Sequence, residues 1–68
     1  MDEQYFIKVH FSIFKSAWVE YIDWDDMMIY YTKDFYQAGY FEPYERACEL
    51  AEFLETQKDV AWAEVITR

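Results

Sequence analysis

The clearest pattern in the chain is an alternation of apolar and more polar positions near its N-terminus. Over residues 5–15, every second position belongs to one apolar set: Tyr5, Ile7, Val9, Phe11 and Ile13. Because side chains of a strand point alternately to two faces, this period of two predicts a β-strand with one buried face. The other face would carry a mixed set: Phe6, Lys8, His10, Ser12 and Phe14.

Two further strands are predicted between residues 18 and 33, where the alternation is less regular. Residues 15–17 would form a tight connection into a second strand over residues 18–24. Asp25 and Asp26 then indicate a turn, because Asp tolerates turn geometry. A third strand would cover residues 28–33, followed by a loop over residues 34–41 that contains Gly39. A helix over residues 17–31 is the alternative, but the density of aromatic and β-branched residues favours strands.

A helix is predicted to begin at Pro43. Proline suits a first helical position because its missing N–H has no partner there, and Glu42 and Glu45 place negative charge at the positive end of the helix dipole. An apolar stripe at helical spacing follows, formed by Ala47, Leu50, Ala51 and Leu54 and extended by Tyr44. The stripe fades over residues 56–59, and residues 60–67 predict a last short strand. The order β-β-β-α-β predicts an α+β fold, with one helix on one face of a small antiparallel sheet, in a single domain over residues 1–68.

The net charge of the chain narrows the classes of partner. Fourteen Asp and Glu residues face six Lys and Arg residues, which gives a formal charge of −8. Nucleic acids and anionic membranes attract basic groups, so direct binding to either is not expected. A basic protein surface is the natural electrostatic partner. Alternatively, the charge serves only to keep an aromatic-rich domain in solution.

Two groups of carboxylates are candidates for contact with a basic partner. At helical spacing, four glutamates would share the sector opposite the apolar stripe and resemble a run of phosphates: Glu42, Glu45, Glu49 and Glu52. The alternative is an ordinary solvated helix face, since Glu is a good helix former. The second group is the acidic turn of Asp23, Asp25 and Asp26. Calcium binding is not expected there, because methionines and isoleucine occupy positions 27–29, where a calcium loop needs oxygen ligands and a glycine.

The aromatic residues exceed what one small core readily absorbs, at 24% of the chain. Some rings are therefore predicted at the surface, where a contiguous group usually marks an interface. The candidates for a partly exposed second face of the sheet are Phe6, Phe14, Tyr36 and Tyr40, with Tyr30 or Tyr31. Such a face suits a homodimer or a protein partner. The alternative is that these rings wrap an undersized core.

No catalytic site, metal site or cofactor is predicted. His10 is the single histidine and has no candidate nucleophile with an orienting third group. Cys48 is the single cysteine, which excludes an internal disulfide and, with so few ligands, a structural zinc site. One glycine cannot build a phosphate-binding loop. The lack of a signal peptide and of a long apolar run predicts a cytoplasmic protein.

In small size, acidity, lack of catalytic groups and sheet-plus-helix order, the chain resembles the small inhibitors carried by phages and mobile elements. Anti-CRISPR proteins and other anti-defence DNA mimics are examples of this type. The resemblance extends over the whole chain without a family motif, so it assigns a role to no individual residue. It implies an acidic inhibitor that occupies a basic, nucleic-acid-binding surface of a target protein in a host cytoplasm. The alternative function is an aromatic-rich, homo-oligomeric or accessory interaction module without mimicry.

Overall fold

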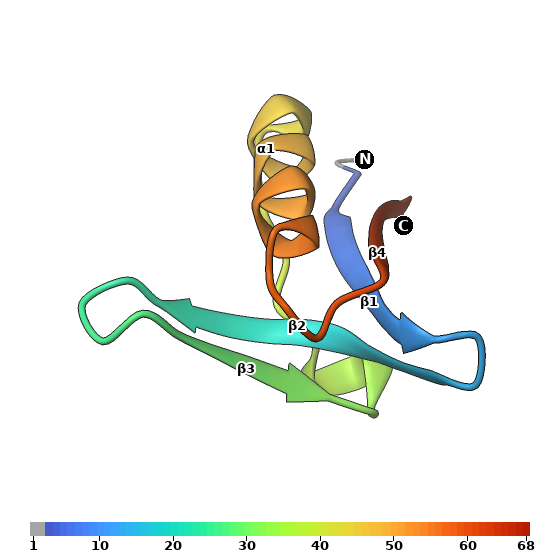
Figure 1. Cartoon of the computed structure of the whole chain (residues 1–68). Coiled ribbons are helices and arrows are strands. Elements are labelled where there is room, and N and C mark those ends of the chain that lie inside the picture. Colours follow the sequence, from blue (N-terminus) through green and yellow to red (C-terminus); the bar gives the residue numbers. More distant parts are fainter. Residues whose placement is uncertain (1–2) are drawn as a thin grey trace.

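The computed structural model describes residues 3–68, which form one four-stranded antiparallel sheet, one α-helix and a short 3-10 helix (Figure 1). The elements in chain order are β1 (Tyr5–Ser12), β2 (Lys15–Asp23), β3 (Met28–Thr32), the 3-10 helix η1 (Phe35–Gln37), α1 (Tyr44–Glu55) and β4 (Trp62–Thr67). The strands lie in the order β3-β2-β1-β4. The predicted α+β fold with one helix and a small antiparallel sheet is confirmed.

The largest shift from the predicted boundaries is at the first hairpin. β1 ends at Ser12 and β2 begins at Lys15, so the turn lies at Ile13 and Phe14 rather than at residues 15–17. The register shifts between His10 and Ser12, and the Ser12 hydroxyl accepts the N–H of Phe14 at 3.1 Å. These local bonds carry Ile13 out of the strand, where its side chain is 78% exposed. Ile13 therefore does not extend the buried face of β1, as its place in the alternation predicted.

The second hairpin shows that residues 17–31 form strands and a turn rather than the alternative helix. The Asp23 side chain accepts the N–H groups of Asp25 (3.1 Å) and Asp26 (3.3 Å) through Oδ1. Such a bond from an aspartate to the backbone two or three residues further on stabilises a turn. Met27 completes this turn with a left-handed backbone (φ 55°). The turn predicted at Asp25 and Asp26 is confirmed.

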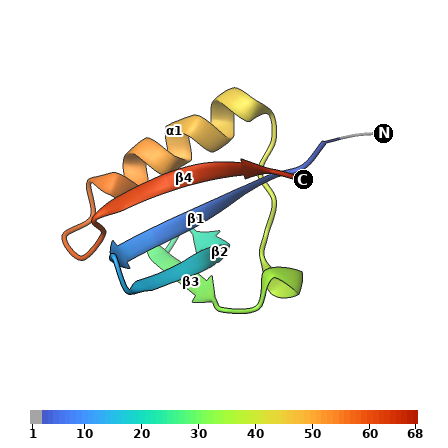
Figure 2. The same ribbon diagram turned by 90° about the vertical axis from the view of Figure 1, so that its right-hand side faces the viewer.

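α1 packs on β1 and β4 and buries one face of the sheet (Figure 2). The fully buried strand residues Ile7, Val9 and Val19 belong to the same core as Leu50 and Leu54 of the helix. Burial of one such side chain contributes about 1.5–3 kcal/mol. On β4, the cross-strand partners of Ile7 and Val9 are Val65 and Ala63, which complete this face. The predicted apolar stripe of the helix is thus the stripe that meets the sheet.

The helix begins one residue later than predicted. Pro43 is the N-cap, with an extended backbone (ψ −176°), and its carbonyl accepts the N–H groups of Arg46 (2.9 Å) and Ala47 (3.1 Å). Glu42 precedes this cap and therefore lies outside the helix. At the other end of the connection to β4, Val60 is buried before the strand begins at Trp62. Among residues 3–68, no helix combines the length and apolar character that a membrane crossing requires.

The connection between η1 and α1 links the two faces of the sheet (Figure 2). η1 lies on the face opposite α1, where the Phe35 ring contacts Phe6 (4.8 Å between centroids) and Trp18 (4.9 Å). Further along, the Gly39 N–H donates to the Val19 carbonyl (3.1 Å), and the Phe41 N–H donates to the Tyr5 carbonyl (2.8 Å). Residues 39–41 therefore bridge β2 and β1. A Cβ atom at Gly39 would overlap the backbone carbonyl oxygen of Glu20, so only glycine fits this close approach.

Candidate functional site: an acidic surface beside α1

Three of the four glutamates predicted to share a helix face do so. Glu45, Glu49 and Glu52 are exposed on α1, and the buried residues of the helix lie on its opposite side. At spacings of three and four residues, neighbouring Cβ atoms are about 5–6 Å apart. Glu42 does not belong to this row, and its predicted place on the helix face is wrong. The reason is the extended backbone at Pro43, which separates Glu42 from the helical repeat.

Trp24 joins the acidic turn of the β2–β3 hairpin to α1. Its ring centroid lies 5.5 Å from that of Phe53, and the Arg46 guanidinium lies 5.7 Å from the Trp24 ring. Arg46, Glu49 and Phe53 follow one another at spacings of three and four residues, so they share one flank of the helix. The turn that follows Trp24 is therefore on the same side of the molecule as Glu49.

We treat the two carboxylate groups that the sequence suggested separately as one candidate region, which Trp24 connects. We call it the acidic surface, and its members are Glu45, Glu49 and Glu52 of α1 with Asp23, Asp25 and Asp26 of the hairpin turn. The turn carboxylates are exposed except for Asp23, which is half-buried because it accepts the turn N–H groups. The contact through Trp24 could not be predicted from spacing, because it joins residues about 30 positions apart in the chain.

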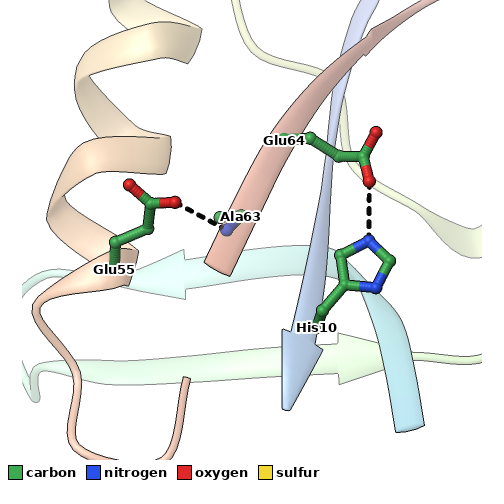
Figure 3. Close-up of polar contacts among 4 residues, drawn as sticks. All are labelled: His10, Glu55, Ala63 and Glu64. Atoms are coloured by element: carbon green, nitrogen blue, oxygen red, sulfur yellow. Dashed lines mark hydrogen bonds and ion pairs between the residues drawn. The ribbon is translucent and has the colours of Figure 1, made fainter. Parts of the chain in front are cut away.

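Few carboxylates have an internal counter-ion. Within the described part of the chain, the single contact of this kind is the hydrogen bond between His10 Nε2 of β1 and Glu64 Oε2 of β4, at 2.7 Å (Figure 3). Glu55 is also used internally, because its Oε2 accepts the backbone N–H of Ala63 at 3.0 Å (Figure 3). Across residues 3–68, no member of the acidic surface has a cation within 4.0 Å. Its carboxylates therefore face solvent without an ion pair in the described chain, and Arg46 is the one cation of α1.

A cleft of about 340 Å³ opens between α1 and β2, beside the acidic surface. Its floor is apolar, because the buried side chains of Ile22 and Leu50 line it. Apart from Gly39, its other lining residues are aromatic or charged: Glu20, Tyr21, Trp24, Tyr40, Phe41, Glu42 and Arg46. Tyr21 lines it beside Ile22, although its ring stacks on Tyr30. Tyr40 and Glu42, which the sequence placed on different surfaces, lie together in this cleft. Arg46 is the one cationic residue of its lining.

The predicted aromatic face is only partly correct. Phe14 and Tyr36 are exposed, at 92% and 93%. Phe14, however, lies in the first turn rather than on a strand face. Phe6 faces away from α1 as predicted, but it is only 6% exposed because Phe35 of η1 and Trp18 of β2 cover it. The predicted exposure of Phe6 is therefore wrong. In the described chain, no ring contact joins Phe14, Tyr36 and Tyr40 into one patch.

The face of the sheet opposite α1 holds residues that the sequence reasoning did not single out. His10 stacks on Trp62, with centroids 4.3 Å apart and an interplanar angle of 9°. Lys8 lies over the Trp18 ring (5.6 Å), and the Arg68 guanidinium lies over the Phe35 ring (4.7 Å). The strand register accounts for two of these contacts, because Lys8 is opposite Trp18 and His10 is opposite Trp62. Strand register is set by long-range pairing, which one strand's alternation does not specify.

Tyr31 and Tyr44 have raised pKa values. Burial raises the pKa of Tyr31 above its ordinary value, and the charge of Asp59 adds to this. A hydrogen bond with Cys48 is the main cause that raises the pKa of Tyr44. Neither tyrosine lines the cleft. Over residues 3–68, no three His, Cys, Asp or Glu side chains gather as metal ligands would.

Comparisons of the chain with protein-family models, with curated proteins and with solved structures gave no match. The candidate function therefore rests on the two surface features described above, the acidic surface and the adjoining cleft.

Proposed function

We propose that this chain is a non-catalytic binding protein whose acidic surface occupies a basic surface of another protein. The observation that carries the proposal is the row of exposed carboxylates on α1, to which Trp24 connects the acidic turn. The Trp24 contacts with Phe53 and Arg46 hold the acidic turn on the flank of the helix that bears Glu49. Because none of these carboxylates has a cation within 4.0 Å in the described chain, a partner's Lys and Arg side chains would form ion pairs with them.

The rigidity of the elements favours this mode of binding. Three of the carboxylates stand on a helix whose opposite side is buried in the core, so their backbone needs no ordering when a partner arrives. A single exposed ion pair contributes only about 0–1 kcal/mol, so binding would depend on several carboxylates acting together. The field of a −8 chain would also speed the encounter with a basic partner at low salt.

A more specific form of the proposal is that the chain inhibits a nucleic-acid-handling protein. A groove that binds a phosphate backbone is lined with cations at short intervals. The row Glu45, Glu49 and Glu52 offers regularly spaced negative charges on a rigid support, as a phosphate backbone does. The chain would then act as a DNA mimic of the anti-CRISPR or other anti-defence type, which it resembles in size, acidity and element order.

The test uses two double variants of equal net charge. Glu49→Lys with Glu52→Lys reverses part of the acidic surface, while Glu3→Lys with Asp59→Lys reverses two exposed carboxylates outside it. Each immobilised chain is exposed to a bacterial lysate at low and high salt, and the captured proteins are identified by mass spectrometry. Binding of a labelled duplex DNA to the captured protein is then measured by fluorescence anisotropy, with and without the soluble chain.

We expect the wild type and the control pair to capture a basic protein at low salt, to release it at high salt and to displace its DNA. The Glu49→Lys, Glu52→Lys chain should do none of these. Equal capture by both double variants, or capture that high salt does not reverse, would contradict the proposal. Capture without DNA displacement would support binding to a basic partner but would exclude DNA mimicry.

The sheet face opposite α1 favours a second candidate function, a homo-oligomeric or accessory interaction module. Tyr36 and Trp62 are exposed on or beside this face, at 93% and 38%, next to the cations Lys8 and Arg68. Association through rings would tolerate salt, since it depends on buried apolar area. Sedimentation velocity over a range of concentrations and salt separates the two candidates. A monomer under all these conditions would exclude self-association.

A further inference from the structure

The cleft between α1 and β2 has the composition of a site for an organic cation. Trp24 and Tyr40 are each about half exposed (45% and 55%) and line the same space. Faces of aromatic rings attract cations, and desolvation strengthens the attraction. The floor of Ile22 and Leu50 offers an apolar surface to the methylene groups of a long side chain. A cation with an aliphatic stem would match both parts of this lining.

The charges of the cleft also favour a cation. Glu20 of β2 and Glu42 of the loop before α1 line it, and both are exposed. Arg46 is the one cation among the lining residues, which leaves one negative charge in excess. Neither carboxylate has a cation within 4.0 Å in the described chain, so both are free to accept hydrogen bonds from a ligand.

Arg46 shows how a guanidinium packs against Trp24 in the lining of the cleft. Its guanidinium lies over the Trp24 ring at 5.7 Å, without an ion pair to either carboxylate. The cleft volume of about 340 Å³ lies within the range of small-ligand sites. Space for a second long side chain therefore exists between Arg46 and Tyr40.

We propose that this cleft receives an arginine or lysine side chain of the basic partner. The cationic group would lie between the rings of Trp24 and Tyr40, with Glu20 and Glu42 as its counter-ions. This inference rests on the proposed function, which supplies the basic partner. It goes further by naming a specific pocket beside the acidic surface, into which one residue of the partner inserts. Glu20 is a residue that the sequence did not indicate for any role.

The test uses a minimal probe with a neutral control. Acetyl-Gly-Arg-Gly-amide carries one cation and no other charge, and the same peptide with citrulline replaces the guanidinium by a neutral group of similar shape. Each peptide is titrated into ¹⁵N-labelled chain, and the indole N–H signal of Trp24 and the backbone signals of Glu20 and Glu42 are followed by NMR. Acetyl-Gly-Lys-Gly-amide, titrated in the same way, distinguishes lysine from arginine.

Two double variants of equal net charge distinguish binding in the cleft from general electrostatic attraction to an acidic protein. Glu20→Gln with Glu42→Gln should weaken binding of the arginine peptide about tenfold, because bonds to charged groups are lost. Glu49→Gln with Glu52→Gln removes the same charge from the acidic surface and should change it less than about twofold. Tyr40→Ala removes one wall without a change of charge and should also weaken binding, so the test does not depend on one variant folding.

Equal losses in the two double variants would overturn the inference, because they would show attraction by net charge alone. Binding of the citrulline peptide as tightly as the arginine peptide would overturn it as well, and so would binding unaffected by Tyr40→Ala. These outcomes are independent of the lysate experiment. If the cleft fails while the Glu49→Lys, Glu52→Lys chain still loses its partner, the proposed function stands without the pocket.

Discussion

The indole ring of Trp24 packs against the phenyl ring of Phe53, with centroids 5.5 Å apart and planes inclined by 48°. This contact attaches the tip of the β2–β3 hairpin to α1. Trp24→Ala should free the acidic turn from the helix and lower the free energy of unfolding by about 1–2 kcal/mol, since the indole is only half-buried. Urea unfolding gives the stability, and salt-dependent capture of a basic partner gives the function. Trp24→Phe, which keeps a ring, should retain most of both; capture by Trp24→Ala equal to the wild type would contradict the role of the contact.

Gly39 is expected to tolerate no side chain. A Cβ atom there would overlap the Glu20 carbonyl oxygen, which is backbone and cannot rotate away. Gly39→Ala should therefore lower the free energy of unfolding by about 1–3 kcal/mol, the usual cost of overpacking. It should also weaken the bond from the Gly39 N–H to the Val19 carbonyl, which hydrogen exchange at Gly39 would report. An unchanged urea midpoint would show that residues 39–41 do not bridge the two strands tightly.

Glu55 protects an edge of the sheet. β4 is an edge strand, and the Glu55 carboxylate accepts the outward N–H of Ala63 at 3.0 Å. Exposed edge N–H groups can pair with strands of other chains. Glu55→Ala should increase self-association at high concentration, as measured by sedimentation velocity, whereas Glu55→Gln keeps an acceptor and should remain closer to the wild type. If both variants sediment as the wild type does, the edge needs no such protection.

Alkaline pH should destabilise the chain in part through Tyr31. Burial raises the pKa of Tyr31 above its ordinary value of 10.0, so the folded state favours the neutral phenol. The stability from this preference is complete below the unfolded pKa and is lost as the pH rises through the folded pKa. Tyr31→Phe should therefore show a shallower loss of stability above about pH 10. Urea midpoints measured from about pH 8 to about pH 11 test this, and parallel profiles for the two chains would contradict it.

The sequence predicted the parts of the fold that depend on local periodicity. The alternation around Ile7 and Val9 and the stripe around Leu50 and Leu54 correspond to the two sides of the observed core. The helix row of Glu45, Glu49 and Glu52 follows from the same helical repeat.

The features that escaped prediction depend on contacts distant in sequence. Phe6 is buried because η1 folds back onto the sheet, and no periodic pattern precedes so short an element. The cleft required the β2–β3 hairpin to approach α1 through Trp24, which neither segment indicates alone. Glu42 left the helix row because a cap is defined by backbone angles rather than by residue type alone.

The sheet order has a consequence for the time course of synthesis. β1 is an inner strand, and one of its two neighbours is β4, whose pairing ends with Tyr5 opposite Thr67. Beyond this pair, Gln4 and Arg68 exchange two backbone hydrogen bonds, at 2.7 and 2.8 Å. During synthesis β1 is therefore made well before its neighbour β4, and the β1–β2–β3 meander can pair before β4 exists. Until β4 has been made, the edge of β1 that it pairs with exposes unpaired backbone groups, which other chains could contact.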